Sequence, residues 1–458
     1  MKFLVLICFY LSFLPVSAQQ FSLDVYIDTA LNSNLSIQQK EASYEKSILA
    51  LKEARGLFFP SVDINARYTV ARGGRMIDFP VGDLLNPVYN TLNALTQSQI
   101  FPQIENESFS FYREQEHETK FRLTQPIINS EIYYNERIKK DLVKVEEASL
   151  DVFRRDLVSE VKSAYFMYWQ SLELLKIMTQ TEELLLENIR INERLFENDM
   201  VTEDNIFKSK AELSKFEQER SDAIKNHNMA RAYFNFLLNR DLDNIIQPDS
   251  SILNFTEGIY VLDELVIKST EEREEIKQLE YYQSVNHNIT KLNKSAALPN
   301  VTGVVDYGFQ GEEYSFTTDD DYMLASIVLQ WNLFNGLQKR RKTEQAKIDE
   351  MIIRDKLKET KQQINLQVVN SYYGLDAAYK KIEAAQNELN ASAKSFEIVR
   401  KKYNQGIIPL IEFINARNEY TGARRNLIIS KYDYLIKHTE FERISCLYDL
   451  NSEDDKTY

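Results

Sequence analysis

Two long stretches without proline constrain this chain more than any other feature. Residues 130–198 and 336–404 each carry apolar residues at alternating spacings of three and four. At 1.5 Å per residue, each predicts a helix on the order of 100 Å long, several times the thickness of a bilayer. A second helical stretch follows each one, at about 203–240 and 409–447. We therefore predict two antiparallel coiled-coil hairpins.

The apolar seams of these helices predict packing against partner helices and not a ligand site. The other faces carry Lys, Glu, Gln and Asn, which places the hairpins in water. The seam positions are Leu157, Val161, Ala164, Tyr168, Leu175, Met178, Leu185 and Ile189, then Leu375, Ala378, Ile382, Ala385, Leu389, Phe396, Val399 and Tyr403, and finally Tyr420, Ala423, Leu427, Tyr434 and Phe441.

Four shorter stretches alternate with the period of a β-strand. After Pro60, the even-numbered residues from Val62 to Val70 are apolar or aromatic, and the odd-numbered residues between them include Asp63, Asn65 and Arg67. The segments 117–124, 301–309 and 323–331 show similar alternation. One such strand fits a soluble sheet with one wet face. Four of them, after an export signal and with no sign of a globular core, favour strands between lipid and water.

The sequence contains an internal repeat. Leu23, Ile37 and Pro60 recur 239 residues later, whereas the later marks LTQPIINS and LQWNLFNG are 206 apart. The difference predicts an insertion around residues 73–115 in the first half. We predict a first repeat at 19–240, a connector at 241–260, a second repeat at 261–447 and a short acidic tail at 448–458. Each repeat is expected to run helix, strand, strand, long helix, long helix.

The insertion contains its own helical pattern. The positions Leu84, Leu85, Val88, Tyr89, Leu92 and Leu95 predict a short amphipathic helix. A lid or plug over a pore mouth and packing between chains are the two roles open to it, and packing is the simpler.

The first 18 residues have the pattern of a secretory signal peptide, with an early Lys, an apolar run and a small-residue cleavage site. Cys8 lies inside the apolar run and not after the cleavage site, which argues against a lipid anchor. Removal of residues 1–18 leaves Cys446 as the single cysteine, so no intrachain disulfide is expected. No later stretch is long and apolar enough for a transmembrane helix.

Several functional classes find no support. The net charge of −14 argues against nucleic acid as a partner. His117, His227, His287 and His438 fall on four different predicted elements, so we expect no metal site and no cofactor. The chain has no GxxxxGK phosphate loop and no catalytic constellation, so we expect no enzyme.

Four strands cannot close a barrel. An open sheet edge in hydrocarbon leaves N–H and C=O groups unpaired at several kcal/mol each, so other chains must complete the sheet. Two copies give eight strands, whose interior is filled by side chains, and three give twelve strands and a wet pore. Transport favours three copies.

Several marks of the chain carry a resemblance to a known family. They are Pro60 and Pro299 before strands, QPIINS and WNLFNG after strands, and Phe196-Glu197-Asn198-Asp199 and Tyr403-Asn404-Gln405-Gly406 at the hairpin turns. In this order and in duplicate, they resemble the TolC-type outer-membrane efflux proteins over nearly the whole mature chain.

The resemblance implies an α+β membrane protein with four antiparallel strands and long coiled-coil hairpins in each chain. Three chains would form a twelve-stranded β-barrel in the outer membrane of a Gram-negative bacterium, continuing into a twelve-helix α-barrel in the periplasm. The implied partners are a periplasmic adaptor protein, an RND-type or ABC-type inner-membrane transporter and outer-membrane lipid. The implied function is a passive exit duct.

The resemblance also implies roles for particular residues. The constriction candidates are Asp204, Asn205, Glu412 and Asn415, the adaptor-contact turns are Asn198, Asp199, Gln405 and Gly406, and the junctions of strand and helix are Pro60, Gln125, Pro126, Pro299 and Trp331. Some members tie neighbouring helices with a basic and an acidic residue. These positions fall on Ile408 and Asn205, so that ionic lock is absent here.

Alternatives remain open. Within transport, the duct serves multidrug efflux, type I protein secretion or metal-ion efflux, because the pump selects the substrate. A different class is a periplasmic coiled-coil scaffold whose strands form a soluble domain, and that class predicts extraction without detergent.

Overall fold

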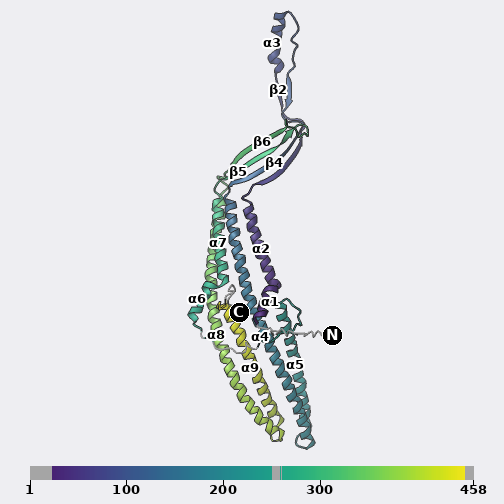
Figure 1. Cartoon of the computed structure of the whole chain (residues 1–458), viewed down its shortest axis with the longest axis vertical. Helices are drawn as coiled ribbons and strands as arrows, with labels where there is room; N and C mark the ends of the chain where they lie inside the picture. Colours follow the sequence, from purple (N-terminus) through teal and green to yellow (C-terminus); the bar gives the residue numbers. More distant parts are fainter. Residues whose placement is uncertain (1–22, 250–257, 259, 449–458) are drawn as a thin grey trace, which may run out of the picture. The chain divides into compact units, whose positions relative to one another are not determined.

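The computed structural model describes residues 23–249, 258 and 260–448 (Figure 1). The predicted signal peptide, Cys8, much of the predicted connector and nearly all of the predicted tail lie outside these residues. The helices are α1 (Leu23–Ser33), α2 (Leu35–Gly56), α3 (Val81–Thr96), α4 (Ser130–Glu197), α5 (Asp204–Leu237), α6 (Leu262–Glu272), α7 (Glu274–Ser295), α8 (Gln338–Asn404) and α9 (Leu410–Ile444). The strands are β1 (Ser61–Val70), β2 (Met76–Phe79), β3 (Glu107–Ser110), β4 (Gln115–Ile128), β5 (Asn300–Gly311) and β6 (Asp321–Gln330).

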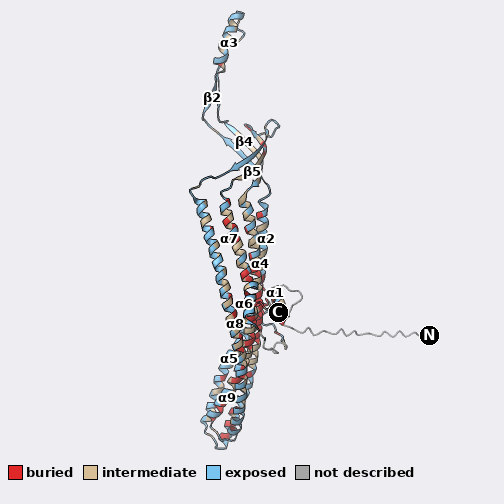
Figure 2. Ribbon diagram, turned by 90° about the vertical axis from the view of Figure 1, so that its left-hand side faces the viewer, coloured by how far each residue is buried: buried red, intermediate tan, exposed pale blue. Residues whose placement is uncertain are grey.

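The two predicted hairpins are present as α4 with α5 and as α8 with α9. The long members, α4 and α8, have 68 and 67 residues, close to the predicted bounds. Their predicted seams are buried or partly buried, and Figure 2 shows buried residues along the helices. Within the described part of the chain, no helix combines the length and the apolar character needed to cross a membrane.

The chain divides into two compact units, and each contains parts of both predicted repeats. The first comprises residues 1–47, 142–283 and 352–458, and the second comprises 48–141 and 284–351. The boundaries of the repeats therefore stay a prediction. One feature accords with them: the helix breaks at Asn34, between α1 and α2, and again at Arg273, between α6 and α7, 239 residues later.

The first unit contains a hydrophobic core, so the expectation of no globular core was wrong. The short helices α1 and α6 add Tyr26, Ile27 and Leu265 to the seam residues of α4, α5, α8 and α9. Tyr26 packs edge-on against Phe234 with ring centroids 5.2 Å apart. Burial of this kind requires segments more than 200 residues apart, and the local pattern of each helix does not reveal it.

The four predicted strands form one antiparallel sheet in the second unit, in the order β1-β4-β5-β6. The register aligns Asp63 with Arg122 and Arg122 with Asp306, so charged residues share one face. Apolar residues share the other, where Val62 pairs with Leu123 and Leu123 with Val305. The predicted alternation of the strands is confirmed.

The insertion folds as a separate hairpin of the second unit. The predicted helix is present as α3, with Pro87 inside it. Strands β2 and β3, which precede and follow α3 in the chain, pair antiparallel, and the residue pattern did not predict them. They are four residues each, too short for a reliable alternation signal.

Candidate functional site

The two hairpin turns have the same backbone geometry. Asp199 and Gly406 both adopt left-handed conformations, with φ of 54° and 69°. At each turn the left-handed residue and the next donate their N–H groups back to the last helical turn: Met200 N to Leu195 O at 2.9 Å, and Ile407 N to Lys402 O at 3.1 Å. This double hydrogen bond is the Schellman ending of a helix.

The turns lie close together within the first unit. A Cβ added at Gly406 would come within 2.6 Å of the Met200 Cε atom. The left-handed backbone favours glycine at position 406, and the Met200 contact shows how near the two turns are. The predicted adaptor-contact residues Asn198, Asp199, Gln405 and Gly406 are all exposed.

An apolar cluster, which we call the turn cluster, joins the two hairpins beside these turns. It consists of Ile191, Leu195, Phe396, Tyr403, Leu410, Phe413, Ile414 and Ala416. The rings of Tyr403 and Phe413 stack with centroids 4.7 Å apart. The cluster buries residues of α4, α8 and α9 together, so it holds one hairpin against the other.

A buried polar network crosses the turn cluster. The Tyr403 hydroxyl donates to Asn192 Oδ1 at 2.5 Å, and the Asn192 amide donates to Ser209 Oγ at 2.8 Å. Burial raises the pKa of Tyr403 to about 12, although the Asn192 contact opposes the rise, so the hydroxyl keeps its proton. The network connects α8, α4 and α5, and a group left unpaired there would be costly.

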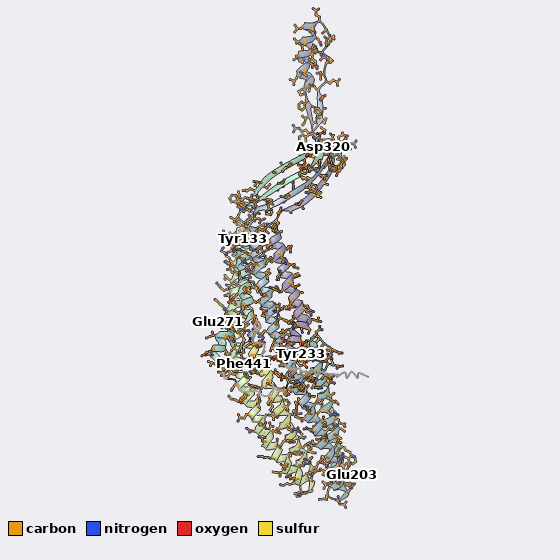
Figure 3. All side chains as sticks on the ribbon, in the orientation of Figure 1. Tyr133, Glu203, Tyr233, Glu271, Asp320 and Phe441 are labelled. Carbon is orange, nitrogen blue, oxygen red and sulfur yellow. The ribbon has the colours of Figure 1, made fainter. Side chains whose placement is uncertain are left out.

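The four predicted constriction residues follow the turns. Asp204, Glu412 and Asn415 are exposed and Asn205 is partly buried. Lys208 forms an ion pair with Asp204 at 2.8 Å, and hydrogen bonds from Lys208 and Thr202 lower the pKa of this carboxyl group. Figure 3 labels Glu203, the exposed residue just before α5. The acidic character at the first turn is therefore present at neutral pH.

Sequence reasoning missed a buried arginine that joins the hairpins. Arg417 of α9 is 3% exposed, and its Nη2 contacts Glu212 Oε2 of α5 at 2.8 Å and Asn418 Oδ1 at 2.9 Å. The available signal was that Arg417 follows Leu410 and Phe413 at the three-four spacing of the seam. A charge at a seam position requires a partner from another helix.

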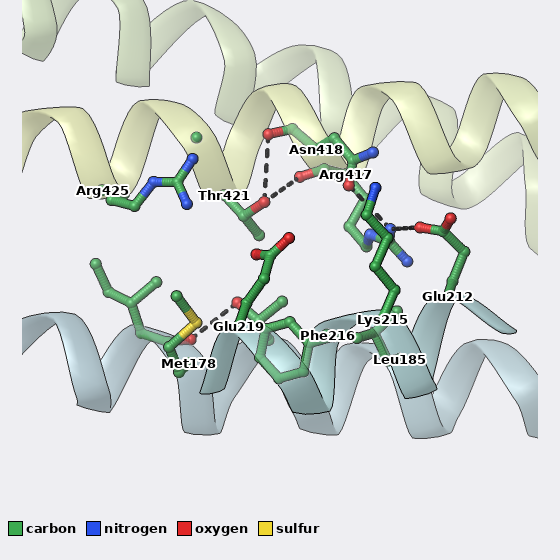
Figure 4. Close-up of a pocket in the computed structure, with 13 residues that line it drawn as sticks. Met178, Leu185, Glu212, Lys215, Phe216, Glu219, Arg417, Asn418, Thr421 and Arg425 are labelled. Carbon is green, nitrogen blue, oxygen red and sulfur yellow. Dashed lines mark hydrogen bonds and ion pairs between the residues drawn. The ribbon is translucent and has the colours of Figure 1, made fainter. Parts of the chain in front are cut away.

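A cavity of about 180 Å³ lies beside the Arg417–Glu212 pair (Figure 4). Residues of α4, α5 and α9 line it, with Phe216 and Leu185 on one side and Thr421 and Arg425 on another. Arg417 Nη1 is buried without a hydrogen-bond partner. The site thus combines an ion pair between the hairpins with an adjoining cavity.

The predicted junction residues lie at or near the ends of strands. Pro60 immediately precedes β1, Pro299 immediately precedes β5 and Trp331 immediately follows β6. Gln125 and Pro126 lie within β4, which continues to Ile128 with an irregularity in its register after Pro126. The indole Nε1 of Trp331 donates to the carbonyl oxygen of Ala297 at 2.9 Å.

The four histidines lie on β4, α5, α7 and α9. His117 is fully buried in the sheet unit, and His227 contacts Ser171 Oγ at 3.1 Å. In the part of the chain that the structure describes, no three His, Cys, Asp or Glu residues are placed to hold a metal ion.

A comparison with protein families bears directly on this arrangement. The sequence model of the family described as "Outer membrane efflux protein" matches residues 265–444, which contain β5, β6, α8 and α9. The chain is therefore similar to this family over its second predicted repeat. The description of this family is that of an efflux protein and not of an enzyme. No curated protein sequence matches the chain.

Solved structures resemble the chain over 92% of its length. The CmeC outer membrane channel of Campylobacter jejuni is 15% identical, with 85% of that chain covered and a TM-score of 0.73. The outer membrane protein VceC of Vibrio cholerae is 12% identical, with 95% covered and a TM-score of 0.74. The MtrE outer membrane channel of Neisseria gonorrhoeae, in its open state, is 14% identical, with 88% covered and a TM-score of 0.72. At these identities the likeness establishes the fold.

Proposed function

We propose that three copies of this chain form one continuous exit duct, with their strands in the outer membrane and their hairpins in the periplasm. The observation that carries the proposal is the sorting of the sheet. Arg122 donates to Asp306 through two bonds of 2.7 Å on one face, and Ile327 on β6 is 77% exposed. A charged face suits a wet pore and an apolar face suits lipid.

The two edge strands of the sheet support an assembly of three copies. β1 and β6 are the outer strands, and each has a row of backbone groups without a partner strand among the described residues. Pairing β6 of one copy with β1 of the next satisfies these groups. Three copies give twelve strands, which leaves room for water, whereas two give a barrel filled by side chains.

The segment after β6 is suited to the edge of the membrane. Trp331, Leu333 and Phe334 are 55–78% exposed. They line a cavity of about 650 Å³ together with Lys339 and Arg340. Aromatic rings beside basic groups are typical of a membrane interface with anionic headgroups. We assign Trp331 to anchoring the sheet in lipid through this interface.

The hairpin turns are assigned to a periplasmic adaptor that connects the duct to an RND-type or ABC-type transporter. Asn198, Asp199, Gln405 and Gly406 are exposed on turns of matching geometry, which offers an adaptor two equivalent contacts per chain. The acids near these turns, including Asp204 and Glu412, would attract cations to the entrance.

We further propose that contacts between the two hairpins close the periplasmic entrance of the duct. Ile408 and Asn205 cannot form the ionic lock of some family members. The Arg417–Glu212 pair joins α9 to α5 instead and offers a substitute of the same chemistry. Movement of one hairpin relative to the other would widen the entrance, with Asp204, Asn205, Glu412 and Asn415 nearest to it.

The decisive experiment places a photo-crosslinking amino acid at Gln405 in cells and identifies the captured proteins. Position Lys225, exposed on α5 away from the turns, is the matched control. Capture at Gln405 but not at Lys225 of an adaptor from a proton-driven pump supports multidrug efflux. Capture of an adaptor from an ATP-driven exporter assigns the duct to type I secretion, and one from a metal exporter assigns it to metal-ion efflux.

The same cells test the proposal against a scaffold. A chain that leaves the membrane fraction without detergent and captures only other periplasmic proteins would overturn the duct and favour a periplasmic coiled-coil scaffold. A chain that needs detergent for extraction supports the membrane sheet, independently of which adaptor is captured.

A further inference from the structure

Residues 76–110 form a segment that we call the arm, and the polar side chains on one side of its helix α3 make hydrogen bonds within it. Side chains along one stripe of α3 bind the returning segment 97–106, and Asn86 exchanges two hydrogen bonds with the Ile104 backbone at 2.8 and 2.9 Å. Asn93 does the same with Phe101 at 2.8 and 3.1 Å. Asp83 accepts from the Asn106 side chain at 3.0 Å.

The opposite side of α3 carries an apolar seam, which we call the α3 seam. Its residues are Val81, Leu85, Val88, Leu92 and Leu95, at successive spacings of four, three, four and three. At 100° per residue these positions point roughly opposite to the polar stripe. Val88 is 51% exposed and Leu95 is 76% exposed, and the flanking Leu84 is 70% exposed.

The spacing of the apolar residues in α3 and its low charge indicate which partner packs against the α3 seam. A repeat of four and three is the pattern by which parallel helices pack around a common axis. Asp83 is the only charged residue in α3, and it lies on the polar stripe. Identical helices placed side by side therefore meet no like charge at the seam or its flanks, so a second copy of the same helix fits there.

We propose that the α3 helices of three chains pack along their seams as a parallel three-helix coiled coil. The inference rests on the proposed trimer, because a threefold axis brings the same helix of each chain to one line. The packed seam has no lumen, so the bundle closes the axis of the pore and solutes leave between the three arms. An apolar seam left open would instead be a site of aggregation.

The test uses the full-length protein with Cys446 replaced by serine, which leaves no native cysteine among the described residues. Val88→Cys places a thiol on the α3 seam, and Ala94→Cys places one at an exposed position on the other side of the helix. We expect mild oxidation to link most Val88→Cys trimers into covalent dimers on a non-reducing gel. Ala94→Cys trimers should stay unlinked.

The trimer itself is measured separately by light scattering in detergent. Trimers that link at neither position, or equally at both, overturn the α3 bundle and leave the proposed function intact. Monomers in detergent overturn the trimer first, and the bundle falls with it.

A second pair of variants tests the chemistry of the seam. Adding Leu92→Glu to Val88→Cys should reduce linking at least tenfold, because it places three carboxylates at the packed seam, whereas Ala94→Glu, on the other side of the helix, should leave linking unchanged. A photo-crosslinker at Val88 in cells should capture the same chain. Capture of a different protein alone would assign the seam to that partner and overturn the bundle.

Discussion

The helical unit and the sheet sort their residues in opposite ways. In the helical unit Phe441 of α9 is 0% exposed, and charged residues cover the outside. In the sheet Ile327 is 77% exposed, while Asp306 is 2% exposed and bonded to Arg122. This sorting accords with the proposed function, in which water surrounds the hairpins and lipid surrounds the sheet, and substitutions should then have opposite consequences in the two regions.

The largest effect is expected in the helical core. Phe441→Ala removes a ring that packs against Tyr260 at 4.8 Å between centroids. The lost burial and the cavity should lower the free energy of unfolding by about 3–5 kcal/mol. Denaturant unfolding followed by circular dichroism measures it. Phe236→Ala, at a 65% exposed position of α5, is the control and should cost much less.

The next largest effect is expected in the sheet, where the substitution adds a charge instead of removing an apolar group. Ile327→Arg places a charge on the exposed apolar face, which costs about 2–4 kcal/mol where that face meets the middle of a bilayer. We expect a large loss of heat-resistant trimer from the outer membrane, measured by gel electrophoresis without boiling. Ser326→Arg projects from the opposite face and should be tolerated better. Equal losses would contradict the sorting of the two faces.

A smaller effect is expected where a charge lies inside the helical unit. Arg417→Ala removes the contact to Glu212 at 2.8 Å, and because Glu212 stays 29% exposed it can recover water. We expect a loss of about 1–3 kcal/mol and faster proteolysis at the hairpin turns. Arg425→Ala lines the same cavity at an exposed position and is the control. Unchanged proteolysis in Arg417→Ala would remove the proposed link between the hairpins.

The smallest effect concerns pH. Burial lowers the pKa of His438, although Glu442 opposes the shift, and Lys162 adds to it. The unfolded chain therefore takes up this proton first, as the pH falls through about 6.5. Stability from His438 is present above that pH and lost on acidification. Melting temperature should fall from pH 7.5 to 5.5, and fall less in His438→Gln.

Carboxylates titrate in the same experiment, so the control is a second histidine. His227 is that control, because burial also lowers its pKa, so His227→Gln should likewise reduce the slope of melting temperature against pH. The same slope in wild type and His438→Gln would show that another group causes the loss.

Local patterns predicted many of the elements and left their partners open. The seams gave both hairpins to within a few residues, because the 3.6-residue period is visible in any one helix. The strand alternation gave β1, β4, β5 and β6 for the same reason. The two strands of the insertion were missed because each has only four residues.

The candidate site likewise has parts that local sequence predicts and parts that it does not. The turns at Asp199 and Gly406 were predictable, since Asn, Asp and Gly tolerate left-handed backbone. The Arg417–Glu212 pair and the Asn192–Tyr403 bond were not, because each joins residues more than 200 positions apart. The roles of Asp204, Asn205, Glu412 and Asn415 stay predictions.

The sequence by itself determined the lengths of the helices, the two faces of each strand and the resemblance to an efflux family. Only the tertiary structure decided that β4 pairs with β5, that α1 and α6 close a core on the long helices, and that Arg417 meets Glu212. The physical reason is range. A helix or strand records its environment in its own periodicity, whereas the choice of partner depends on free energies summed over segments that are distant in the chain.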